Sequence, residues 1–315
     1  MKQLPLALAL TLALAACGPS ADKTAAPEAA SDQPTEVVAP AAAPAEQSAT
    51  EASPADPVAG VLTGAWRSDD NKARDAFRHP AETLAFFGVA PGQTVIEISP
   101  GGGWYTEILA PMLMGNGTYV AAYPLDATSD YSKRNNDKFR EKLAANPDQY
   151  GAAMSVEYDT KAPNFGMDGS ADVVLTFRNV HNWGDGAPAM FAAFNAVLKP
   201  GGTLGVVEHR AADGADAESL KGSGYLPTDA VIKLATDAGF ELADQSEINA
   251  NPKDTKDYEK GVWTLPPSLA LKDVDRDKYV AIGESDRMTL KFKKPEGDQI
   301  FEQGTDKAKP TPASN

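Results

Sequence analysis

Only three histidines occur in this chain of 315 residues, and two of them occupy comparable positions. His181 comes shortly after the apolar segment 171–177, and His209 follows a second apolar segment at 203–208. Because imidazole titrates near neutral pH, it can take a proton from a reacting hydroxyl or an acidic carbon. We therefore regard His181 and His209 as candidate catalytic residues and His79 as a candidate substrate-lining residue. The alternative for each is a histidine with a purely structural role.

A glycine-rich turn, Glu97-Ile-Ser-Pro-Gly-Gly-Gly103, follows another apolar segment. Glycines let a backbone turn sharply and approach a ligand closely, and a helix beginning after the turn presents unpaired N–H groups. A dinucleotide-binding turn needs G-x-G-x-x-G and an acid at the end of the second strand. Here Trp104 follows the glycines and the second apolar segment ends in Tyr123. The Gly-Lys-Ser/Thr of a phosphate-binding loop is also missing, so NAD and nucleoside triphosphates are disfavoured.

Apolar segments at regular intervals predict the elements that position these residues. Helices are expected at 70–87 with a break at Pro80, from the glycine turn to 113, and at 135–143, 187–198 and 228–238. Strands are expected at 94–98, 118–123, 154–158, 171–177, 203–208, 241–248 and 287–293. Short apolar strands that alternate with helices indicate a mainly parallel sheet covered on both faces. We predict an α/β fold with a doubly wound, mostly parallel seven-stranded sheet in a single domain, whose ligands bind at the carboxyl ends of the strands.

Three segments together resemble the class I S-adenosylmethionine-dependent methyltransferases. An acid followed by a glycine-rich turn at the end of the first strand is similar to their motif I. ADVVLTFRNVHNW at 171–183 and VLKPGGTLGVVEH at 197–209 resemble the fourth strand and the Leu-Lys-Pro-Gly-Gly turn of small-molecule methyltransferases. The resemblance covers roughly residues 76–295 and extends to a group of uncharacterised bacterial predicted methyltransferases. It implies a Rossmann-like fold, S-adenosylmethionine as cofactor, and methyl transfer to a small-molecule or lipid-soluble acceptor.

The resemblance also implies which residues hold the ligands. From their positions in the sequence, His79, Arg178 and Trp183 are candidate acceptor-lining residues, with the alternative that Arg178 and Asn179 orient the cofactor carboxylate. Ser99 stands where many members have glycine, and Tyr123 replaces the acid that usually holds the ribose hydroxyls, with Asp126 as a possible substitute. These departures leave open a second possibility, a catalytically weak or inactive methyltransferase-fold periplasmic binding protein. The implied cofactor-binding residues are Glu97, Ser99, Gly101, Gly102, Gly103, Tyr105, Tyr123, Asp126, Asp159 and Asn179.

The amino terminus, MKQLPLALALTLALAAC, has one lysine and an apolar run too short to span a bilayer, which is typical of a secretory signal. Its end, Leu14-Ala15-Ala16-Cys17, resembles the lipobox of bacterial lipoproteins. That resemblance implies lipidation of Cys17 and attachment to the cell envelope facing the periplasm, in the outer membrane by analogy with known sorting rules. Residues 18–57 are rich in alanine and proline and predict a disordered tether. Residues 58–302 form the expected methyltransferase-like domain, and 303–315 a disordered tail.

Composition limits the classes of molecule that this protein is expected to bind. A formal net charge of −15 argues against binding of nucleic acid, which requires a basic face. The single cysteine excludes a disulfide framework and a cysteine-rich metal site. Asp185, Glu208 and His209 could in principle hold a divalent ion, but no ligand-spaced pair supports this, so no metal is predicted. The expected partners are a small-molecule acceptor and, through the lipid on Cys17, a membrane.

Overall fold

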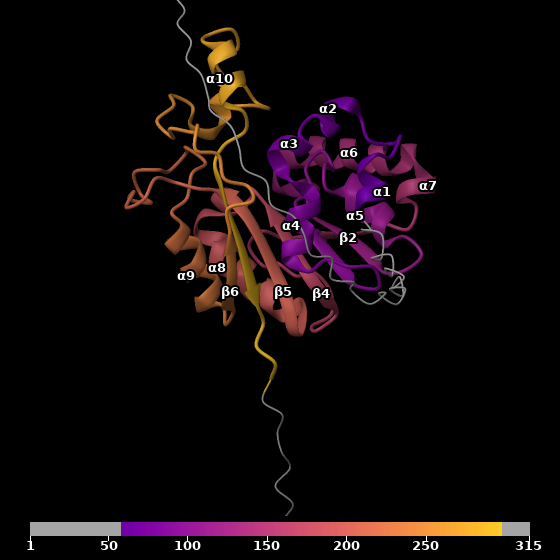
Figure 1. The fold of residues 1–315 in the computed structure, drawn as a ribbon. Coiled ribbons are helices and arrows are strands. Elements are labelled where there is room, and N and C mark those ends of the chain that lie inside the picture. Colours follow the sequence, from indigo (N-terminus) through magenta and orange to yellow (C-terminus); the bar gives the residue numbers. More distant parts are fainter. Residues whose placement is uncertain (1–57, 298–315) are drawn as a thin grey trace, which may run out of the picture. The chain divides into compact units, whose positions relative to one another are not determined.

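In the computed structural model, which describes residues 58–297, a seven-stranded sheet forms the centre of the domain (Figure 1). The strand order is β3-β2-β1-β4-β5-β7-β6. In this described part, six strands run in the same direction and β7 runs in the opposite direction. The sheet confirms the predicted doubly wound, mostly parallel architecture. Its strands are β1 (Thr94–Ile98), β2 (Thr118–Pro124), β3 (Met154–Tyr158), β4 (Ala171–Phe177), β5 (Leu198–His209), β6 (Glu241–Ser246) and β7 (Arg287–Lys293).

The helices differ from the sequence-based expectation in their number and in their bounds. The helix expected at 70–87 is three short helices, because the chain breaks near Ala73 as well as before Pro80. The surface helix α6 begins five residues earlier than predicted, where the Ser129 side chain caps its first turn. Helix α10 lies in a region for which only loops were expected. The α-helices are α1 (Ala59–Leu62), α2 (Asp69–Lys72), α3 (Asp75–Arg78), α4 (Pro80–Phe87), α5 (Thr106–Leu113), α6 (Asp130–Ala145), α7 (Pro147–Tyr150), α8 (Ala187–Val197), α9 (Thr228–Asp237) and α10 (Arg276–Ile282).

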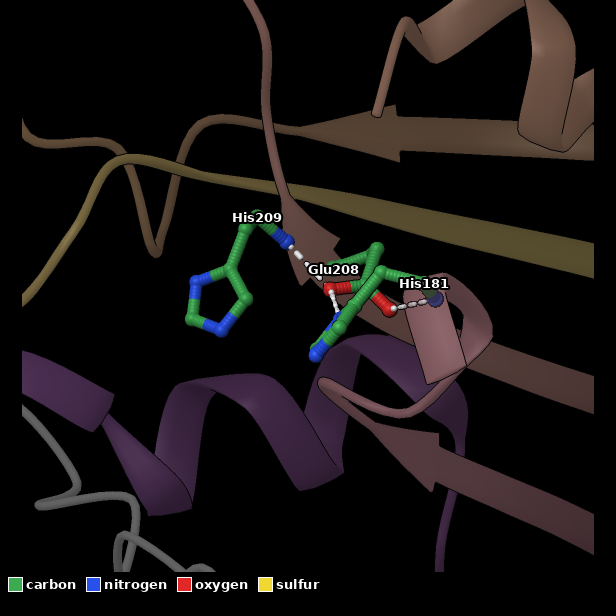
Figure 2. Close-up of side chains that lie close together, drawn as sticks. All are labelled: His181, Glu208 and His209. Atoms are coloured by element: carbon green, nitrogen blue, oxygen red, sulfur yellow. Dashed lines mark hydrogen bonds and ion pairs between the residues drawn. The ribbon is translucent and has the colours of Figure 1, made fainter. Parts of the chain in front are cut away.

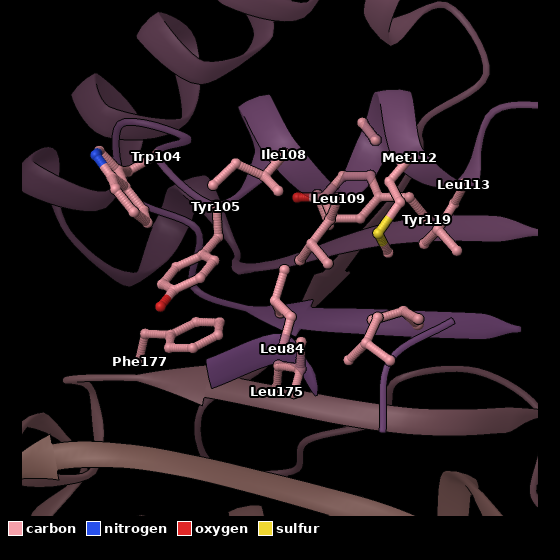
Figure 3. Packing of buried hydrophobic residues seen from close by; sticks show 14 of the residues in the cluster. Leu84, Trp104, Tyr105, Ile108, Leu109, Met112, Leu113, Tyr119, Leu175 and Phe177 are labelled. Atoms are coloured by element: carbon pink, nitrogen blue, oxygen red, sulfur yellow. The ribbon is translucent and has the colours of Figure 1, made fainter. Parts of the chain in front are cut away.

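Alternate residues of the central strands enter two separate hydrophobic cores, one on each face of the sheet. Val95 on β1 packs in one core with α4 and α5, whereas its neighbour Ile96 packs in the other with α8 and α9. Figure 3 shows part of the first core, where Ile108 and Leu109 of α5 are fully buried beside the sheet. Burial of side chains of this size stabilises the fold by roughly 1.5–3 kcal/mol each. The strands are therefore apolar on both faces, as their sequences indicated.

The two central strands, β1 and β4, both end in an unusual backbone conformation. Ser99 directly follows β1 with φ 51°, and Arg178 directly follows β4 with φ 62°. Residues other than glycine seldom adopt positive φ, and such positions concentrate at functional sites. Because β1 and β4 are neighbours from which the chain order diverges, this point is also the topological switch of the sheet, where α/β folds bind ligands.

Several predictions lie outside the described residues, namely the signal peptide with Cys17, the tether at 18–57, positions 298–302 of the domain, and the tail. They remain predictions. Within 58–297, no helix combines the length and the apolar character needed to cross a bilayer.

Candidate functional site

A cavity of ≈ 540 Å³ lies at the carboxyl ends of the parallel strands, a size in the usual range for sites that bind small molecules. Its wall takes residues from directly after β1 and β4, from the ends of β2, β3 and β5, from α3 and α6, from the loop at 262–268, and from the segment that precedes β7. Its polar and aromatic lining residues include Arg78, Ser99, Tyr123, Tyr158, Arg178, Asn179, His181, Trp183, His209, Glu284 and Ser285.

Of the three glycines in the turn, only Gly101 lines the cavity, next to Ser99 and Pro100. It has φ 59°, and, apart from its two chain neighbours, no residue has an atom within 4 Å of the position that a Cβ would take. Gly102 and Gly103 do not line the cavity; instead, Nζ of Lys142 on α6 donates hydrogen bonds to their carbonyl oxygens at 2.9 and 3.2 Å. The turn is thus held by α6 from outside the cavity, and Gly101 offers the open space for a ligand to approach the backbone.

Polar groups beside this turn are fixed by neighbouring strands. The Ser99 hydroxyl shares a hydrogen bond of 2.8 Å with the Tyr158 hydroxyl at the end of β3. The Asn179 side-chain amide donates to the carbonyl of Ile98 at 3.0 Å, which connects the end of β4 to the end of β1. Tyr123 at the end of β2 completes this part of the wall. Ser99, Asn179 and Tyr123 therefore line the cavity beside the glycine turn, together with Tyr158, which was not anticipated from the sequence.

Four predicted ligand-binding residues are engaged elsewhere and do not line the cavity. Tyr105 is buried and stacks on Phe177 with ring centroids 3.6 Å apart, so it packs in the core instead of binding a ligand. Asp126 accepts hydrogen bonds from Asn136 and Arg140 at 2.8 Å each. The Asp159 carboxylate caps its own turn, and His79 forms the left-handed junction between α3 and α4. Sequence alone could not show these local contacts.

Glu97, the acid before the glycine turn, also lies outside the cavity wall. Its carboxylate is buried between β1, β2 and α5, where it accepts hydrogen bonds from the hydroxyls of Tyr119 at 2.6 Å and Thr106 at 3.1 Å. Burial raises the pKa of Glu97 to about 7, although those two hydrogen bonds counteract it. Its evident role in this structure is to fix the start of α5 against the sheet.

The raised pKa of Glu97 predicts a specific dependence of stability on pH. Between pH 4.5 and about 7 the folded chain keeps a proton that the unfolded chain has lost, so the free energy of unfolding decreases as the pH rises. At about 1.4 kcal/mol per pKa unit, the decrease is on the order of 3 kcal/mol. Glu97→Gln should abolish this decrease, as measured by urea unfolding at several pH values. Glu141→Gln, which removes an exposed carboxylate, is the control; the prediction is wrong if both variants keep the wild-type slope.

The two candidate catalytic histidines lie side by side on the cavity wall, with ring centroids 5.3 Å apart (Figure 2). Nδ1 of His181 is 3.0 Å from a carboxylate oxygen of Glu208, which is fully buried and also accepts the backbone N–H of His209 at 2.7 Å. Since an ionised carboxylate only accepts hydrogen bonds, Nδ1 of neutral His181 carries the proton. The other ring nitrogen, Nε2, is then unprotonated and able to accept a proton.

His209 is held by a different partner. Its Nδ1 lies 2.6 Å from the hydroxyl of Ser285, a residue shortly before β7. Burial, with the neighbouring His181 and nearby arginines, lowers the pKa of His209 well below its ordinary value. His209 is therefore neutral at physiological pH, and a cation at this position is electrostatically disfavoured.

His181, Glu208 and His209 also have the geometry of a possible metal site, with one potential ligand atom from each residue within 4.8 Å of the others. Asp185, considered from the sequence, is not in this group. Two observations argue against a divalent cation here. Glu208 already accepts hydrogen bonds from both histidines, and the positive charges of Arg178, Arg287 and Arg78 act on His209. The site suits proton transfer better than metal binding.

An arginine cluster adjoins the histidines. Glu284 accepts hydrogen bonds from Arg74 at 2.7 Å and from Arg78 at 3.0 Å, and it pairs with Arg287 at 3.0 Å. Arg178, at the end of β4, lines the cavity nearby. Burial opposes ionisation of Glu284, but the attraction of the four arginines outweighs it and lowers the pKa of Glu284 to about 2.

Glu284 and Ser285 were not predicted from the sequence, because the carboxyl-end rule points only to residues that follow strands, and these two precede β7. β7 runs antiparallel to β5, with His209 paired to Arg287, so the residues before β7 reach the same edge of the sheet as those after β5. The alternation of Arg287–Lys293 predicted the strand but not its direction.

The sequence matches no protein-family model and no curated protein. Solved structures do resemble the fold. Phosphoethanolamine N-methyltransferase 2 of Haemonchus contortus, in complex with S-adenosyl-L-methionine, has a TM-score of 0.50 at 16% identity over 70% of this chain and 53% of that chain. A SAM-dependent methyltransferase of Aquifex aeolicus has a TM-score of 0.45 at 14% identity over 70% of this chain and 93% of that chain. The chain therefore has the Rossmann-like fold seen in class I methyltransferases; at these identities the likeness concerns the fold alone.

Proposed function

We propose that this protein is an S-adenosylmethionine-dependent methyltransferase that acts on a small acceptor. The observation that carries the proposal is a single cavity that extends from the glycine turn after β1 to the histidine pair after β4 and β5. At one end, the open space beside Gly101 can hold the methyl donor. At the other end, His181 can accept the proton that a protonated nucleophile loses when it is methylated.

The residues at the β1 and β2 end fit the cofactor. Gly101 leaves its Cβ position open to the cavity, and Ser99, Tyr123 and Asn179 surround that space with a hydroxyl, an aromatic ring and an amide. When bound there, S-adenosylmethionine supplies an electrophilic methyl group on a positively charged sulfur. Enclosure of both reactants in one cavity supplies the alignment on which such a displacement depends.

At the other end, His181 is the proposed general base. As the acceptor is methylated, Nε2 of His181 would take up the proton that the acceptor loses. Glu208 holds Nδ1–H and stabilises the imidazolium that results. Neutral His209, beside it, is placed to position the acceptor.

Isothermal titration of the purified chain with S-adenosylmethionine and S-adenosylhomocysteine tests the proposal. We expect saturable binding of one ligand per chain, with S-adenosylhomocysteine displacing S-adenosylmethionine. Guanosine at the same concentration is the control, since it carries a ribose and a base but no phosphate and no amino-acid group. Absence of binding at millimolar S-adenosylmethionine and S-adenosylhomocysteine would contradict the enzyme proposal.

One observation favours the second candidate, a binding protein with little catalysis. Asp126, the possible substitute for the ribose-binding acid, is held by Arg140 and Asn136 outside the cavity wall. Weak binding of S-adenosylmethionine, together with tight binding of another small molecule, would support that candidate.

A further inference from the structure

The guanidinium of Arg178 differs from the other charged groups of the cavity wall. Arg178 follows β4 in a left-handed conformation and lines the cavity. Among residues 58–297, its side chain has neither a carboxylate within ion-pair distance nor a hydrogen-bond acceptor. Burial lowers its pKa, but an arginine in a protein keeps its proton. Arg178 is thus a charged donor group facing an open space.

The surroundings of Arg178 carry an excess of positive charge. Glu284 interacts with all four arginines of the cluster, three of them by direct contact. One carboxylate cannot compensate four guanidinium groups, and Nε of Arg287 is buried without a hydrogen-bond partner. An uncompensated buried charge is costly. An anion in the cavity would lower that cost. It would also accept two parallel hydrogen bonds from the guanidinium of Arg178, the bidentate geometry that this group favours.

The positions of these residues in the sheet indicate whether the acceptor or the cofactor supplies the anion. The glycine turn and Tyr123 lie at the ends of β1 and β2, whereas His209, Glu284 and Ser285 lie at the ends of β5 and β7. β2 and β5 are three strand spacings apart, about 14 Å. Arg178 acts electrostatically on His209 and on Glu284 and, as the weakest contribution there, on Glu97 before the glycine turn. Because Glu284 and Arg287 lie at the start of β7, beside the end of β5, the arginine cluster is centred on the acceptor side of the cavity.

We propose that Arg178, backed by Arg78, forms an anion subsite that binds a carboxylate or phosphate group of the acceptor. The subsite itself follows from the charges, and only its assignment to the acceptor rests on the function proposed above. An anionic group bound here would place the rest of the acceptor against His181 and His209, and the class of substrate is thereby narrowed to small acids or phosphate esters.

Inorganic phosphate is the probe for the subsite. Titration of the purified chain with phosphate at constant ionic strength, with chloride as the balancing ion, should show saturable binding. Arg178→Met should weaken that binding about ten- to hundredfold, as expected for loss of a charged hydrogen-bond donor, and Arg178→Lys should restore part of it. Arg140→Met is the matched control, because Arg140 is already paired with Asp126, Asp137 and Glu157; it should bind phosphate like the wild type.

A second titration separates the acceptor from the cofactor as the source of the anion. We expect phosphate to bind equally well when S-adenosylhomocysteine is saturating, and Arg178→Met to change the affinity for S-adenosylhomocysteine less than about threefold. Competition between the two ligands, or a loss in Arg178→Met of S-adenosylhomocysteine binding but not of 5′-methylthioadenosine binding, would assign Arg178 to the cofactor carboxylate and overturn the proposal.

Wild-type phosphate binding that is undetectable, or is unchanged in Arg178→Met, would remove the subsite. Phosphate binding through Arg178 without any S-adenosylhomocysteine binding would instead refute the proposed function and leave the subsite in place.

Discussion

Gly101→Val is expected to reduce the affinity for S-adenosylhomocysteine at least a hundredfold. A valine at this position directs two methyl groups into the space beside the turn, which no atom within 4 Å of the Cβ position now occupies. It also strains the backbone at φ 59°, at a cost of about 1–3 kcal/mol. Calorimetric titration of the wild type and the variant measures the first effect, and thermal unfolding measures the second.

Two control variants separate the steric effect from the strain. Gly115→Val introduces the same side chain at φ 80°, also without neighbours within 4 Å, in the turn between α5 and β2 at the opposite edge of the sheet. It should lose comparable stability and keep its affinity. Gly102→Val, beside the mutated site but outside the cavity wall, should affect both properties less. If Gly101→Val binds S-adenosylhomocysteine as the wild type does, the cofactor site is placed wrongly.

Glu284→Gln should be the most destabilising single change in the cavity wall. Removal of one member of a buried ion pair costs about 3–5 kcal/mol, and here the carboxylate serves three directly contacting arginines. For a domain of this size the melting temperature should fall by roughly 10 °C. Because the pKa of Glu284 is lowered to about 2, its contribution is present at neutral pH and lost as the pH falls from 4.5 towards 2. The difference between variant and wild type should shrink over that interval.

Glu247→Gln is the matched control for this change. Glu247 pairs with Arg210 at 2.7 Å, but its side chain is 71% exposed. Pairs at the surface contribute about 1 kcal/mol or less, so this variant should unfold close to the wild type. Equal melting temperatures for the two variants would show that the arginine cluster does not depend on Glu284.

The fold could be predicted largely from local patterns. β1 and β4 are short apolar runs that need only their own residues to be recognised, and their bounds agree with the sequence-based prediction. The predicted break at Pro80 is confirmed, with left-handed His79 before α4. The further break near Ala73 and the early start of α6 could not be predicted in this way, because the serine cap at Ser129 depends on local geometry that apolar periodicity does not encode.

The candidate site could be predicted only in part, for a related reason. Arg178 and His181 come shortly after β4 and His209 ends β5, so these three residues could be placed because ligands bind at the carboxyl ends of parallel strands. Glu97 and Tyr105 have the residue types of ligand contacts, but the pleat of β1 and the packing of α5 turn their side chains into the protein. Glu208, which holds His181, is buried on a strand and is recognisable only when the contacts are known.

Because β7 comes last in the chain yet lies between β5 and β6 in the sheet, it affects the order in which the molecule folds. Arg78 and Glu284 are 206 positions apart in the chain, and β7 separates β5 from β6 in the sheet. Contacts over such distances in sequence are slow to form, because a large loop must close first. During synthesis from the amino terminus, β1 to β5 emerge with one edge of β5 unpaired, and Arg74 and Arg78 lack their counter-ion Glu284. The cavity is therefore completed only after most of the chain has been made, and it is among the last features of the protein to form.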